Sequence, residues 1–184
     1  MNDSHGASGC TYFRAGAAVA ILGLTLAGCG GTSPEIAKMT CPEVVPAPGT
    51  ETIVLFRPGG HSAQDVMVTG KVYSANIRCQ HEKAGVAALT ELTFYAERSG
   101  PRILNANLPY FVAVVGPSQK VLAQEAFDAH VAFLPGEPYR RLPAEKITVH
   151  LPVRNTASAS DYSIVVGFQL TPEQLAYNRS AGLK

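Results

Sequence analysis

Apolar and polar residues alternate along most of the chain after residue 50, which is the pattern of half-buried β-strands. Glu51–Phe56 is the first expected strand. Asp65–Cys79 is a longer one, in which the inward parity changes near Gly70, so a bulge is expected there. Other alternating or apolar runs follow, separated by turns rich in Gly, Pro and Ser. These runs are Val86–Arg98, Leu108–Val115, Lys120–Phe133, Glu145–Leu151 and Asp161–Leu170.

The last alternating run leads into one short helix. Thr171 is a suitable N-cap and Gln174 completes a capping box. Leu175 and Tyr177 are expected to dock this helix onto the strands, and the chain from Asn178 onward is expected to fray. About seven strands, short turns and a single terminal helix predict an all-β fold. We expect an antiparallel β-sandwich of immunoglobulin-like or similar topology.

The first 50 residues show no such alternation. Ala15–Leu26 is apolar and uncharged, but a helix of this length reaches only about 18 Å, short of a bilayer core of about 30 Å. It fits the apolar part of a secretory signal, with Arg14 supplying the positive charge before it. A polar tether follows, and then the proline-rich segment Pro42–Gly49, where the prolines favour an extended arm.

The apolar segment ends in Leu26-Ala27-Gly28-Cys29, which resembles the lipobox of bacterial lipoproteins. The resemblance implies cleavage before Cys29, a diacylglyceryl thioether on its sulfur and an acylated amino terminus. One acyl chain binds a membrane only marginally, whereas several chains anchor a protein stably. Because no Asp follows Cys29, the resemblance implies the outer membrane, facing the periplasm.

This resemblance divides the chain into three parts: the signal peptide 1–28, the lipidated tether and arm 29–50, and the β-sandwich with its C-terminal helix 51–184. The C-terminal half, with the segments LPYFVAVV and VVGFQLTPEQLAYNR, is also similar to bacterial lipoproteins that have no assigned activity.

Two cysteines remain once Cys29 is lipidated and the signal is removed. Cys41 and Cys79 form an even pair in an oxidising compartment, so we predict a disulfide between them. It would pin the arm to the end of a strand, and it contributes about 3–4 kcal/mol in the chain-entropy description. The alternatives are two free thiols, or a metal site that adds His81. The spacing of that site matches no standard zinc arrangement.

Candidate chemistry is sparse in the rest of the chain. The formal net charge is +1 and no basic stripe marks a nucleic-acid surface. Ser62 follows Gly and His as in a nucleophile elbow, but the closing Gly and the following helix are missing. His130 and His150 fall at outward strand positions, where they could bind a metal only if a third ligand converged. No cofactor is expected.

Tyr139, Arg140 and Arg141 form a small basic-aromatic cluster in a predicted proline-rich loop. The cluster could contact a partner, lipid headgroups or peptidoglycan, or simply be solvated. We expect a non-enzymatic envelope lipoprotein, anchored to the membrane, that serves as a protein-binding adaptor or structural module. A small-ligand or metal-binding lipoprotein using the outward histidines or the Cys79/His81 region is one alternative. An envelope hydrolase using the loop serine is another.

Overall fold

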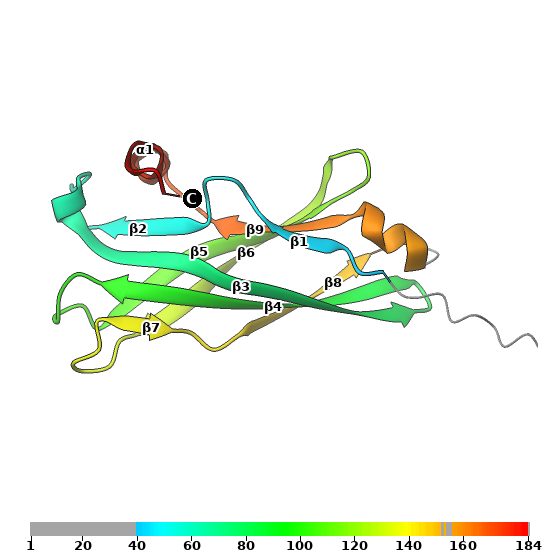
Figure 1. The fold of residues 1–184 in the computed structure, drawn as a ribbon, viewed down its shortest axis with the longest axis horizontal. Helices are drawn as coiled ribbons and strands as arrows, with labels where there is room; N and C mark the ends of the chain where they lie inside the picture. Colours follow the sequence, from blue (N-terminus) through cyan, green and yellow to red (C-terminus); the bar gives the residue numbers. More distant parts are fainter. Residues whose placement is uncertain (1–39, 152, 154–155, 184) are drawn as a thin grey trace, which may run out of the picture. The chain divides into compact units, whose positions relative to one another are not determined.

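A computed structural model describes residues 40–151, 153 and 156–183, which form two packed β-sheets (Figure 1). Sheet A contains four strands in the spatial order β1-β9-β5-β6. Neighbouring strands of this sheet are antiparallel, except that β1 and β9 run parallel. Its strands are β1 (Glu43–Pro46), β9 (Ser163–Phe168), β5 (Asn105–Val115) and β6 (Val121–Ala132).

Sheet B is antiparallel throughout and has the order β2-β3-β4-β7, with β8 also pairing β4. β8 and β7 follow one another along the same edge of β4. Its strands are β2 (Thr52–Phe56), β3 (Val66–Glu82), β4 (Gly85–Arg98), β7 (Tyr139–Arg141) and β8 (Glu145–Leu151). The helical elements are the 3-10 turns η1 (Ala63–Asp65) and η2 (Thr156–Asp161), and the α-helix α1 (Pro172–Ala181).

The predicted all-β sandwich with one terminal helix is confirmed, with nine strands among the described residues where about seven were expected. The two additional strands lie in proline-rich segments, where proline argues against a strand. β7 arises in the predicted loop because Tyr139–Arg141 pairs with Glu97–Tyr95 of β4. β1 arises in the predicted arm and pairs in parallel with β9. The sheets therefore begin before residue 51.

The core lies between the sheets and is built from the inward positions of the alternating runs. Phe94 of β4 is fully buried, with its ring centroid 4.8 Å from that of Tyr110 and 5.5 Å from that of Phe168. These residues bring β4 of sheet B against β5 and β9 of sheet A. Large aromatic side chains contribute most to such a core, because each buries a large apolar area.

The bulge expected near Gly70 is present in β3, where the register with β4 shifts between Val72 and Ser74. Gly70 itself lies against the other sheet, since a Cβ there would come within 2.8 Å of the Leu108 side chain. The extra residue of the bulge is Tyr73, which is 58% exposed. The bulge therefore places a large aromatic side chain at the surface of sheet B.

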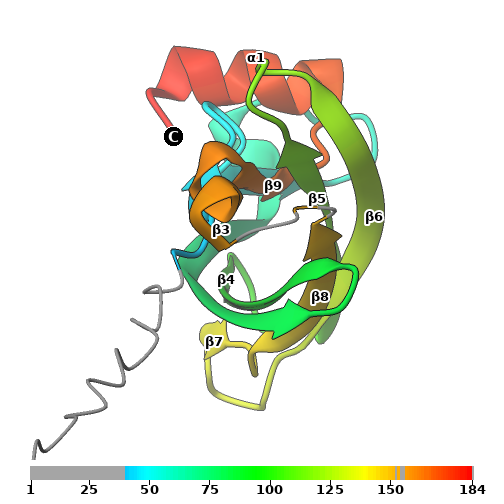
Figure 2. The same cartoon turned by 90° about the vertical axis from the view of Figure 1, so that its right-hand side faces the viewer.

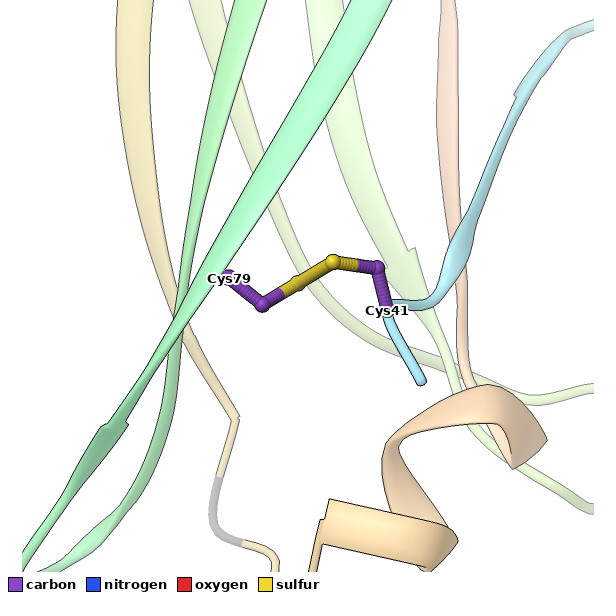
Figure 3. The surroundings of a disulfide bond; sticks show 2 residues. All are labelled: Cys41 and Cys79. Carbon is purple, nitrogen blue, oxygen red and sulfur yellow. A yellow bond between two sulfur atoms is a disulfide. The ribbon is translucent and has the colours of Figure 1, made fainter. Parts of the chain in front are cut away.

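The predicted disulfide joins Cys41 and Cys79, with the two Cα atoms 5.7 Å apart (Figure 3). Cys41 immediately precedes β1 of sheet A, and Cys79 lies near the end of β3 in sheet B. The bond therefore ties the arm to the end of a strand, as expected, and joins the two sheets at one end of the sandwich.

Helix α1 has the predicted capping box: the Gln174 backbone N–H donates to the Thr171 hydroxyl, and the Thr171 N–H donates to the Gln174 side chain. The expected fraying from Asn178 is wrong, because Asn178 is fully buried and the helix continues to Ala181. Gly182, with a φ of +65°, ends the helix in the left-handed region that glycine tolerates.

The helix packs against β2 through polar side chains. Gln174 Nε2 donates to the Val54 carbonyl and Asn178 Nδ2 donates to the Thr52 carbonyl, both at 2.7 Å. Of the two residues expected to dock the helix, Tyr177 is half-buried and meets the Phe56 ring edge-on at 5.2 Å. These two amides lie one helical turn apart and satisfy alternate carbonyls of β2, so α1 covers an edge strand that would otherwise be open.

Candidate functional site

The outer face of sheet B carries a cluster of aromatic and basic side chains from three strands. Tyr73 comes from β3, Tyr95 from β4, and Tyr139 and Arg141 from β7. We call these four residues the tyrosine–arginine patch. They surround a surface hollow of about 610 Å³.

The side chains of the patch hold one another in place. The rings of Tyr95 and Tyr139 stack with their centroids 6.1 Å apart and their planes at 22°. The Arg141 guanidinium carbon lies 4.3 Å from the centroid of the Tyr73 ring, within cation–π range. Tyr73 and Tyr139 are nevertheless 58% and 56% exposed. The patch is thus preorganised while most of its aromatic surface faces solvent.

Sheet register explains how these residues meet. Lys71 of β3 and Arg141 of β7 lie on either side of Tyr95, each as its cross-strand neighbour. Tyr139 lies opposite Glu97 in the same way. Partial desolvation, with the charge of Glu97 as a smaller cause, raises the pKa of Tyr95 above its usual value. Like any tyrosine hydroxyl at neutral pH, it carries its proton and can donate a hydrogen bond.

Arg140 and Arg141 differ in their surroundings, although the sequence presents them together. Arg140 Nη1 lies 3.8 Å from Glu137 Oε2 and forms an ion pair with it. Arg141 has no carboxylate within 4 Å among the described residues, and its guanidinium lies over the Tyr73 ring. The free positive charge of the patch is therefore that of Arg141, with Lys71 beside Tyr95.

The sequence pointed to Tyr139 and the two arginines, but it missed two members of the patch. Tyr73 is an even number of residues from Ile77, which faces inward in β3, so regular alternation would turn Tyr73 inward as well. Only the bulge turns it outward. Tyr95 belongs to the alternating run Val86–Arg98, but alternation within that run does not connect it with the other three residues. The glycine at position 70, which predicted a bulge, was the one indication in the sequence that inward and outward positions exchange in this part of β3.

The loop serine is part of a turn. The Ser62 hydroxyl donates to Asp65 Oδ2 at 2.6 Å, and the Ser62 backbone N–H donates to the same oxygen at 3.1 Å. These bonds, the hydroxyl first, hold the pKa of Asp65 below its usual range. The serine hydroxyl thus binds a carboxylate at the start of η1, and no histidine is placed against it by a hydrogen bond in the described part of the chain.

The two outward histidines lie in different sheets. His130 Nδ1 on β6 is 2.7 Å from Asn107 Oδ1 on the neighbouring strand, and His150 Nδ1 on β8 is 3.2 Å from Glu82 Oε2. The thiol of Cys79 is used in the disulfide. Within the described residues, no three His, Cys, Asp or Glu side chains are grouped as they would be around a metal ion.

Cys29 and the other residues of the lipobox lie outside the described residues, so the structure does not bear on the anchor. No helix in the part of the chain that the structure describes is both long and apolar enough to span a bilayer. The chain matches no protein-family model, no curated protein and no solved structure.

Proposed function

We propose that this protein is a lipid-anchored, non-enzymatic binding protein of the bacterial cell envelope. In this proposal the tyrosine–arginine patch contacts another envelope protein. The patch is the observation that supports the proposal best, because Tyr and Arg are enriched among the residues that dominate binding energies. Stacked tyrosines also lose little conformational entropy when a partner covers them. Arg141 and Lys71 suit a partner that presents carboxylates at this position.

The patch lies away from the end of the sandwich at which the described chain begins. The described chain begins at Thr40, at the end of the sandwich that holds η2 and the turn between β3 and β4, whereas β7 lies toward the opposite end (Figure 1).

The disulfide supports an exported location, because such bonds persist in oxidising compartments and are rare in the bacterial cytosol. The lipobox resemblance supplies the membrane anchor, and the missing Asp after Cys29 favours the outer membrane. Together these features favour the periplasmic face of the envelope.

Intact mass spectrometry of the protein purified from its native membrane tests the anchor. We expect the mass of residues 29–184 plus acyl chains, with a gain of two hydrogens when the disulfide is reduced. An unacylated mass that still includes residues 1–28 would refute the anchor and the location together.

Site-specific photocrosslinking in native membranes tests the patch. A photoreactive phenylalanine analogue at position 139 should give one discrete crosslinked product, whereas the same analogue at the exposed helix position Arg179 should give none. Arg141→Ala should reduce the yield at position 139, because the charge that complements the partner is removed. Equal yields at both positions, or a yield unaffected by Arg141→Ala, would contradict the proposal.

A further inference from the structure

A second feature lies on the side of the sandwich where β6 and β8 are the outermost strands (Figure 2). Among the described residues β6 pairs only with β5, and β8 pairs only with β4. The outer backbone groups of both strands therefore face no strand. This contrasts with β2, whose edge is covered by the amides of Gln174 and Asn178.

The sheets are not closed against each other between these two edges. A cavity of about 240 Å³ opens there, which we call the edge cleft. Its polar lining includes Gln124, Glu125, Thr148 and His150. Its apolar lining consists of Val112, Val114, Ala123, Phe127, Ile147 and Val149.

Two carboxylates interrupt the inward rows of these edge strands. Glu125 of β6 lies opposite the buried Val112, and Glu145 of β8 lies opposite the buried Leu92, so both are on the inner faces of their sheets, where Glu125 is nevertheless exposed. Neither carboxylate forms an ion pair among the described residues. Inward charges on an edge strand discourage random pairing. They also favour an occupant that carries a complementary positive charge.

The size of the cavity indicates what kind of group it can hold. Sites for small molecules usually have about 300–1,000 Å³, whereas a cavity of about 150 Å³ already holds a benzene-sized group. The edge cleft lies between these values, so it suits one or two apolar side chains of a larger partner. The walls of the cleft are strand edges with unpaired backbone groups. An extended polypeptide can fill the cavity with its side chains and form hydrogen bonds to a strand edge with its backbone.

We propose that the edge cleft binds an extended segment of a partner protein, which adds to sheet A as a strand along β6. The first six residues of β6, Val121–Ala126, are all exposed and offer the free edge. Inward side chains of the added strand are about 7 Å apart. An apolar residue fills the cavity, and a Lys or Arg two residues away pairs with Glu125 or Glu145.

A defined peptide pair tests this assignment with the full chain. The probe is a fluorescent, end-blocked Thr-Val-Thr-Lys-Thr-Val-Thr-Lys, and its control has Glu in place of Lys. By fluorescence anisotropy we expect the lysine peptide to bind at least ten-fold more tightly. Glu125→Gln combined with Glu145→Gln should reduce this preference to within about two-fold. Glu43→Gln, at an exposed position of the β1 edge, should leave it unchanged. Equal binding of both peptides, or a preference that survives the double variant, would overturn the proposal.

A second variant tests the cavity itself. Ala123 is an exposed residue of the cleft lining, so Ala123→Phe fills the cleft without altering the buried core. We expect at least a ten-fold loss of probe binding with an unchanged urea midpoint. A folded Ala123→Phe variant that binds the probe normally would refute the site. A wild-type dimer in solution that Ala123→Phe dissolves would overturn the partner assignment in favour of a second copy of this chain.

This inference is independent of the tyrosine–arginine patch and of the anchor. The probe experiment uses neither a membrane nor any patch residue, and Tyr139→Ala should bind the probe as the wild type does. Failure at the edge cleft would therefore leave the proposed function standing, and failure of the photocrosslinking would leave the edge cleft standing.

Discussion

Replacing Gln174 by Ala should destabilise the sandwich far more than its place on a short terminal helix suggests. Its side chain is only 8% exposed and both ends of its amide are used. Nε2 donates to the Val54 carbonyl of β2 at 2.7 Å, and Oε1 accepts the Thr171 backbone N–H at 2.8 Å. The substitution would therefore break the contact with the sheet and half of the capping box at once.

The expected loss follows from these two contacts. Leaving the Val54 carbonyl buried without a donor costs about 1–3 kcal/mol. Losing part of the helix cap adds about 0.5–1 kcal/mol. We expect Gln174→Ala to lower the free energy of unfolding by about 1.5–4 kcal/mol. Asn178→Ala should cost less, because Asn178 Oδ1 has no partner among the described residues and its removal relieves a buried polar atom.

Equilibrium urea unfolding with the disulfide intact measures this loss. With an m-value of about 2 kcal/mol/M, the midpoint of Gln174→Ala should fall by about 0.8–2 M. Arg179→Ala, at an exposed position of the same helix, is the matched control and should change the free energy of unfolding by less than about 0.5 kcal/mol. If Gln174→Ala behaved like this control, the helix would not be fastened to β2 by its amides.

Arg98, the disulfide and Tyr110 give three further predictions. The Arg98 guanidinium is buried and donates to the carbonyls of three loop residues, Pro101, Ile103 and Leu134, so Arg98→Met should lower the free energy of unfolding by about 2–4 kcal/mol in urea. A loss below about 0.5 kcal/mol would show that these bonds are dispensable. Replacing both disulfide cysteines by Ser should cost about 3–4 kcal/mol for a separation of 38 residues, and the reduced wild type should reach the same midpoint. Burial, with smaller effects from nearby carboxylates, raises the pKa of Tyr110 to about 12. Because the unfolded state releases this proton near pH 10, stability should fall as the pH rises from about 10 to about 12, and ultraviolet absorbance should show Tyr110 titrating later than an ordinary tyrosine. A native state in which all tyrosines titrate together near pH 10 would contradict this.

The sequence by itself determined the local features of this protein. Alternation of apolar and polar residues identified the long strands and their inward rows, because the period of a strand is two residues in any sheet. The capping box of α1 and the bulge in β3 were also visible, since each depends on residues close together in the chain. The pairing of Cys41 with Cys79 followed from their number once export was assumed.

Tertiary structure alone decided which strands became neighbours, and both binding surfaces depend on this. Alternation shows which side chains share a face of one strand but carries no information about the strand beside it. The tyrosine–arginine patch therefore appears only when β3, β4 and β7 are placed together, and β7 became a strand only because β4 offered it an edge. The edge cleft likewise requires β6 and β8 to be the outermost strands of opposite sheets. Gln174 and Asn178 look like solvent-facing helix residues in the sequence, and they are buried because the open edge of β2 supplies carbonyl groups that only their amides reach.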